Sequence, residues 1–176
     1  MSAPAPATKP ETNEYAPYYQ KYISLVPEAH VVETLAQQIE ETLALLRGIA
    51  EDRAGFRYGP DKWSVKEVVG HIIDGERIFA YRALAIARGE RQPLPGMEQD
   101  EYMAVANFDA RTLSDLVDEF EHVRRGNVLM LGALDTDAWA RRGVASDNEV
   151  TVRALAHIMA GHELHHVNIL REKYLQ

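Results

Sequence analysis

Hydrophobic residues recur along most of the chain at alternating intervals of three and four, the period of an amphipathic α-helix. No convincing alternation of hydrophobic and polar residues, the pattern of a half-buried strand, accompanies it. The spacing predicts four long helices, over residues 28–54, 64–88, 113–134 and 151 to near the C-terminus. Shorter helices are expected at 14–26, which carries four tyrosines, and at 101–107. The predicted fold class is therefore all-α, an antiparallel four-helix bundle with short extra helices.

Particular residues mark where helices begin. Ser64 and Glu67 have the spacing of a capping box, and Trp63 precedes them where it can pack against Val68. Thr151 is expected to open the last helix. Connections between the long helices are predicted over residues 56–62, 89–100 and 135–148.

Composition narrows the class of protein. With 176 residues, 46% of them hydrophobic, the chain can bury one full core, predicted as a single domain over 14–176 after a disordered tip over 1–13. A net charge of −8 argues against a nucleic-acid partner, because such binding needs clustered lysine and arginine. We find neither a signal peptide nor the ~18 apolar residues that span a bilayer, so no membrane partner and a cytoplasmic location are expected.

The chain contains no cysteine. Disulfides, a thiolate nucleophile of the protein's own and a cysteine-ligated zinc site are therefore excluded. Only nitrogen and oxygen side-chain ligands remain, and imidazole and carboxylate groups suit Zn, Ni, Fe or Mn.

Three histidines and a glutamate crowd the last predicted helix, in the segment Gly161-His162-Glu163-Leu164-His165-His166. Residues four apart lie on one helix face, so His162 and His166 can direct their imidazoles at one point. The segment also matches H-E-x-x-H, in which two histidines bind zinc. No histidine follows before the C-terminus, and Glu172 is too close on the same helix. A third ligand must therefore come from an upstream element.

Comparing the hydrophobic faces of two helices identifies the third ligand. In the last helix, positions spaced by three and four form a core-facing stripe: Val152, Leu155, Met159, His162, His166 and Ile169. The helix that Ser64 caps has a similar stripe: Ser64, Val68, His71, Gly75 and Ile78. Gly75 leaves a gap beside His71. The sequence therefore predicts a metal site of His71, His162 and His166, with open coordination positions typical of catalytic rather than structural metal sites.

The other histidines have simpler interpretations. His157 and His165 point about 140° and 100° away from the predicted ligands around the helix, which favours the rim or the surface. His30 begins a helix and His122 lies in a charged run, so solvated faces explain both.

Charged residues near the predicted ligands leave several roles open. Asp74, one turn from His71, is the candidate catalytic residue, but it could also orient that ring or pair with Arg77 or Arg82. Glu163 points about 100° away from His162 and receives no catalytic role. The two arginines, together with Tyr81, could line a pocket for an anionic substrate.

Three motifs together resemble the DinB-like superfamily, which includes YfiT-type metal-dependent hydrolases. They are Lys62-Trp63-Ser64-Val65-Lys66-Glu67, then His71-Ile72-Ile73-Asp74-Gly75-Glu76, and the terminal segment 161–166. The resemblance covers about Tyr15 to Leu175. It implies up-down-down-up connectivity, a homodimer, and one divalent metal on the same three histidines.

Two enzymatic functions and one non-enzymatic function follow. A three-histidine metal, Zn or Ni before Fe or Mn, can activate water for hydrolysis of a small molecule. Alternatively it can bind a low-molecular-weight thiol as the cosubstrate of a transferase, which we slightly favour from the superfamily resemblance. The alternative without catalysis is a metal-binding or stress-response bundle. A pocket that reaches solvent would favour an enzyme.

Overall fold

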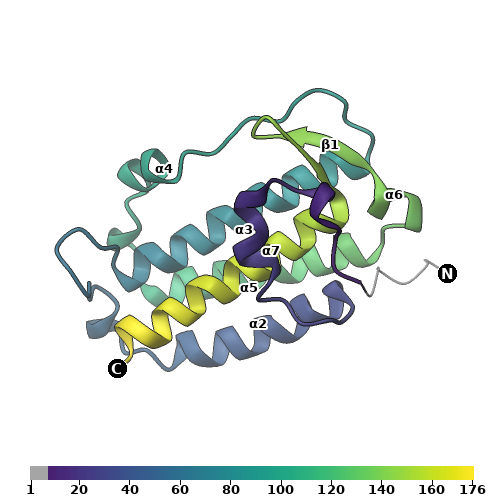
Figure 1. The fold of residues 1–176 in the computed structure, drawn as a ribbon. Coiled ribbons are helices and arrows are strands. Elements are labelled where there is room, and N and C mark those ends of the chain that lie inside the picture. The colour runs from purple at the N-terminus through teal and green to yellow at the C-terminus, as the bar shows by residue number, and fades with distance from the viewer. Residues whose placement is uncertain (1–7) are drawn as a thin grey trace.

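The computed structural model describes residues 8–176, in which four long helices form a bundle (Figure 1). These are α2 (Val31–Arg47), α3 (Val65–Ala87), α5 (Leu113–Gly132) and α7 (Val152–Ile169). A π-helical turn, Leu170–Tyr174, extends α7. The all-α prediction of a four-helix bundle is confirmed. Within residues 8–176, every helix is too short or too polar to cross a bilayer.

The four helices run up, down, down and up along the bundle. α3 contacts α5 and α7, and α2 contacts the same two helices. The end of α7 meets the start of α3, where the Tyr174 hydroxyl donates to the Trp63 carbonyl at 2.7 Å. The connection after α3 returns to that same end, because Phe108 covers Gly70 near the start of α3. α5 therefore runs parallel to α3, as the implied connectivity requires.

Capping residues set the starts of the helices as predicted. The Glu67 amide donates to Ser64 Oγ at 3.1 Å, and the Ser64 amide donates to the Glu67 carboxylate at 2.7 Å. Thr151 caps α7 as predicted, and Thr112 caps α5; each side chain accepts from the amide three residues on. α4 (Gln99–Ala106) forms where a short helix was expected.

Two predicted boundaries were wrong. α2 ends at Arg47, and Glu51–Arg53 forms a separate 3-10 turn, although the hydrophobic period continues past the glycine that ends the helix. The predicted loop 135–148 contains α6 (Thr136–Ala140) and leads into a hairpin of β1 (Arg142–Ala145) and β2 (Asn148–Thr151). Burial does not alternate along either strand, so neither leaves the pattern of a half-buried strand in the sequence.

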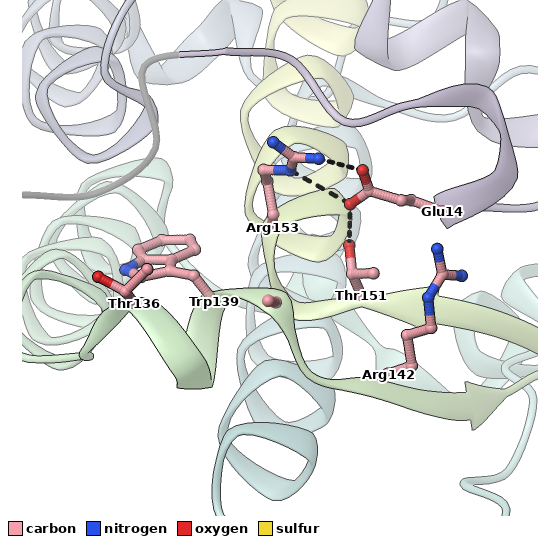
Figure 2. Close-up of a pocket in the computed structure, with 7 residues that line it drawn as sticks. Glu14, Thr136, Trp139, Arg142, Thr151 and Arg153 are labelled. Carbon is pink, nitrogen blue, oxygen red and sulfur yellow. Dashed lines mark hydrogen bonds and ion pairs between the residues drawn. The ribbon is translucent and has the colours of Figure 1, made fainter.

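The segment before α2 crosses the bundle over α7 (Figure 1). Its predicted helix is reduced to a 3-10 turn, Pro17–Tyr19, and the short α1, Gln20–Ile23. The Glu14 carboxylate ties it to α7 by an ion pair with Arg153 and accepts from Thr151 Oγ1 at 2.7 Å (Figure 2). Of the predicted disordered tip, residues 1–7 lie outside the described residues, whereas Thr8 contacts Arg153.

A layer of buried polar side chains divides the hydrophobic core. One hydrophobic cluster surrounds the first half of α7, and the other lies among the starts of α3 and α5 and the end of α2. Along α3, α5 and α7, buried polar residues come between the two clusters: His71, Glu76, Arg124, His162, Glu163 and His166. The candidate chemistry of the chain is therefore concentrated in the middle of the bundle.

Candidate metal centre

α3 and α7 bring the three predicted histidines together. His71 Nε2 lies 3.0 Å from His162 Nε2. The ring of His166 has its centroid 4.7 Å from that of His71 and 4.6 Å from that of His162. One nitrogen of each ring can be chosen so that all three lie within 4.8 Å of one another. Only 4–9% of each residue is exposed. The site is a buried cluster of three converging nitrogen donors.

Gly75 makes room for this cluster. A Cβ atom at position 75 would lie 2.8 Å from Cε1 of His162 and 3.1 Å from its Nδ1. Glycine therefore lets the His162 ring lie directly against α3, one turn after His71. The gap predicted from the sequence is the space that this ring occupies.

Burial keeps the three imidazoles neutral. It lowers the pKa of His71 to about 4 and that of His166 to about 2, and it lowers the pKa of His162 well below its usual value. For His162 and His166, a second cause is the electrostatic effect of the neighbouring imidazoles. A neutral imidazole has a free lone pair, which is the form that ligates metals. The donor set therefore fits a divalent ion such as Zn, Ni, Fe or Mn.

A pocket of about 580 Å³ opens beside His71 and His162. Its walls come from the segment before α2, from α3, from the connection after α3 and from the hairpin turn, and include Tyr18, Tyr19, Phe79, Arg82, Asp100 and Ser146. Tyr18 at its mouth is 59% exposed, so the pocket reaches solvent. Two of the three histidines are thus accessible to a small molecule.

Comparisons with known proteins identify the family and the fold of the chain. The family model of the DinB superfamily matches residues 34–170. The chain belongs to the DinB superfamily. YfiT from Bacillus subtilis, described as a probable metal-dependent hydrolase with an unusual four-helix bundle topology, matches the structure with a TM-score of 0.70. The match covers 93% of this chain and 90% of that chain at 15% sequence identity, so it shows the fold alone. The comparison with curated proteins found no match.

Asp74 lies apart from the pocket of this DinB-superfamily protein. Its side chain is half-buried and lines a different cavity, with Tyr102 and Phe108, and burial raises the pKa of its carboxyl. Neither predicted arginine pairs with it, because Arg77 binds Glu119 and Arg82 binds neutral acceptors. His71 Nδ1 is buried without a hydrogen-bond partner among residues 8–176, so Asp74 does not orient that ring.

Aromatic rings surround the histidines, and this arrangement was not predicted from the sequence. The Trp63 ring centroid lies 4.8 Å from that of His71, and the rings of Tyr22 and Phe79 lie 5.4 Å and 5.5 Å from that of His162. The tyrosines of the first segment were predicted only as part of a short helix over residues 14–26. Their three-to-four spacing was the available signal, but it could not show which surface the segment covers.

Glu163 points away from the histidines, as its position on the helix predicted. Its Oε2 lies 2.7 Å from Nη1 of Arg124, whose Nε and Nη2 donate to the Glu76 carboxylate at 2.7 and 2.9 Å. All three side chains are at least 98% buried. One face of α7 therefore carries the histidines, and another joins a buried ion-pair network with α3 and α5.

The prediction that His157 lies at the rim or surface was wrong. His157 is fully buried, and its Nδ1 lies 2.9 Å from the Arg153 carbonyl, to which it donates. His165 is half-buried, with its ring centroid 5.3 Å from that of Tyr22 and 5.0 Å from that of His166. The surface interpretation holds for His122, which is exposed.

The buried His157 should make stability depend on pH. Burial lowers its pKa in the folded protein, so between that value and the unfolded value of 6.5 the unfolded chain binds more protons. The free energy of unfolding should therefore fall as pH drops below about 6.5, by at most about 1.4 kcal/mol per pH unit from this group. Urea denaturation of wild type and His157→Gln from pH 5 to 8 measures it. Equal slopes in the two proteins would contradict the prediction.

Proposed function

We propose that the protein binds one divalent metal ion through His71, His162 and His166 and is an enzyme acting on a small molecule. The observation that carries this proposal is the convergence of three buried, neutral imidazoles beside a pocket that reaches solvent. A site that only pinned two helices together would need no such pocket. The homodimer and the cytoplasmic location stay predictions.

Side chains around the three histidines would contribute to the reaction beside the metal ion. A divalent ion would supply a Lewis acid that acidifies a bound nucleophile. The rings of Tyr22, Trp63 and Phe79 pack against the histidines, and those of Tyr22 and Phe79 also form an apolar part of the pocket wall. Asp100 lines this pocket whereas Asp74 lines a different cavity, so we propose Asp100 rather than Asp74 as the proton acceptor.

Hydrolysis is the first reaction that we propose, with water as the nucleophile. It is supported by the fold likeness to YfiT, a probable metal-dependent hydrolase. The second candidate is a thiol-dependent transferase. The chain has no cysteine, so a thiol would have to come from a cosubstrate, and the pocket gives such a molecule access to the histidines. Turnover of an ester or amide without added thiol would distinguish the first reaction from the second.

Metal content tests the proposal directly. Wild-type protein purified without an affinity tag should contain about one Zn, Ni, Fe or Mn per chain by inductively coupled plasma mass spectrometry. His71→Ala and His166→Ala should both lose it, because two imidazoles bind these ions far more weakly than three. His122→Ala, which removes an exposed histidine, is the matched control and should keep it. A wild type that takes up none of the four ions on reconstitution would leave the histidines as structural residues.

Gly75 offers a milder test of the same centre. Gly75→Ala should displace the His162 ring, because the added Cβ would lie 2.8 Å from Cε1. Misplacing a ligand in this way should weaken Zn²⁺ binding by about 10- to 100-fold. Competition with a chelator of known affinity measures this, and Gly126→Ala, at a site with nothing within 4 Å of the new Cβ, is the control. Equal affinities in both variants would show that the ring does not need this position.

A further inference from the structure

The pocket beside the histidines extends along one face of α3. His71, Gly75, Phe79 and Arg82 follow one another at helical spacing, and all four line the same cavity. Arg82 lies eleven positions after His71, which corresponds to about 16 Å of helix axis. The cavity therefore has two chemically different ends, with the imidazoles at one and a guanidinium at the other.

Arg82 is a buried cation without a counter-charge. It is 4% exposed, and its Nη2 donates to the Pro95 carbonyl at 2.7 Å and to Ser146 Oγ at 3.0 Å. In the part of the chain that the structure describes, it forms no ion pair with any carboxylate. Arg124, the other deeply buried arginine of the bundle, binds two glutamates. Buried arginines are normally paired, because an isolated buried charge is costly.

The two neutral acceptors fix where the guanidinium lies. They come from the connection after α3 and from the hairpin turn, and both sides of the pocket therefore hold Arg82 in place. A guanidinium has five N–H donors in one plane, so two bonds from a single nitrogen leave donors for a further acceptor. An oxyanion in the pocket would supply both that acceptor and the missing charge.

Three carboxylates of the same pocket argue the other way. Glu98, Asp100 and Asp147 also line it, and alone they would favour a cationic ligand. All three are exposed at the mouth, where solvent and salt screen their charge. A buried charge is screened much less, and Arg82 therefore dominates deep in the pocket. A cationic ligand is the outcome that would refute this reasoning.

We propose that Arg82 determines specificity by binding a carboxylate at one end of an elongated small-molecule substrate, whose reactive end lies at the histidines. This inference rests on the proposed metal centre. It narrows the substrate class to small carboxylic acids long enough to reach from the imidazoles to Arg82.

A series of thiol probes on the cobalt-substituted protein tests how binding depends on the length of the ligand and on the charge at its far end. Thiolate binding to Co²⁺ gives a near-ultraviolet charge-transfer band that is independent of turnover. We would titrate 3-mercaptopropionate, 6-mercaptohexanoate and 8-mercaptooctanoate, each against the mercaptoalcohol of equal length. The acid and alcohol of the shortest pair should bind alike, whereas the longer acids should bind about tenfold or more tightly than their alcohols.

Substitutions test whether Arg82 causes the preference for long acids over alcohols. Arg82→Met should abolish the preference for the long acids while leaving Co²⁺ uptake and alcohol binding unchanged. Ser146→Ala removes one anchor but no charge and should keep the preference. Arg77→Met is the matched control on the same helix, because Arg77 is exposed and paired with Glu119. If Arg82→Met fails to fold, the length series on the wild type and on Arg82→Lys, which keeps the charge, still tests the proposal.

The outcomes separate the two proposals. Protein that takes up no Co²⁺, or shows no thiolate band with any probe, would overturn the metal centre and this inference with it. Normal bands with equal binding of acids and alcohols at every length would overturn only the role of Arg82. Tighter binding of the aminothiol cysteamine than of 3-mercaptopropionate, without any gain for the longer acids, would show that the carboxylates at the mouth decide specificity.

Discussion

Replacing Arg124 by methionine is expected to lower the free energy of unfolding by about 3–5 kcal/mol. The guanidinium is fully buried and joins Glu76 of α3 to Glu163 of α7. Methionine fills a similar volume but leaves two carboxylates in the middle of the core without their cation. Losing one partner of a buried ion pair costs much more than the pair itself contributes, because the remaining charge is desolvated. Urea denaturation at pH 7, followed by circular dichroism, measures the loss.

Position 125 provides the matched control. Arg125 is exposed and pairs with Glu40 and Glu121 at the surface, so Arg125→Met should leave the free energy of unfolding nearly unchanged. The loss in Arg124→Met should also shrink at acidic pH, because burial raises the pKa of Glu163, which without its cation can fold in the protonated form. Equal effects of the two substitutions at pH 7 would mean that the buried network does not hold the helices together.

The position of the three histidines could be predicted from local periodicity. His162 and His166 are four residues apart on a single helix, and His71 lies on the core-facing stripe of another, so each faces the core whatever the distant contacts are. The capping box of Ser64 and Glu67 then fixes where the helix of His71 begins. Features that depend on one helix face and one helix start are readable from a sequence.

Arg124 was missed because its partners are distant in sequence. Arg124 lies in the charged run around His122, which was interpreted as a solvated face, although it falls four residues after Phe120, on the buried face of α5. That spacing indicated that Arg124 is buried. It could not indicate which residues pair with Arg124, since Glu76 lies 48 residues away on another helix.

His157 was missed for a different reason. The prediction assumed that α7 has a solvent-facing side, as a helix at the edge of a bundle does. α7 instead contacts α1, α2, α3 and α6, so the helix is enclosed and every residue from Ala154 to Glu163 is buried. Angular distance from the core stripe therefore says nothing about exposure in this helix. Enclosure by a segment as short as α1 leaves no periodic trace in α7 itself.

Gly161→Ala tests that enclosure and should cost about 3 kcal/mol of unfolding free energy. A Cβ atom at position 161 would overlap the carbonyl group of Tyr22 and lie 2.9 Å from its Cα. These are backbone atoms, which cannot rotate away as a side chain can. α1 would have to move off α7, which removes its buried side chains from the core.

The displacement should act on the candidate site without removing its ligands. The Tyr22 ring covers His162 and His165, whereas the three proposed ligands belong to α3 and α7. Gly161→Ala should therefore keep its metal stoichiometry while losing stability in urea denaturation. Gly126→Ala, with open space around the new Cβ, should be neutral or slightly stabilising, because alanine favours the helix. If Gly161→Ala proved as stable as Gly126→Ala, α1 would not rest on α7 at this glycine, and Tyr22 would not cover the histidines.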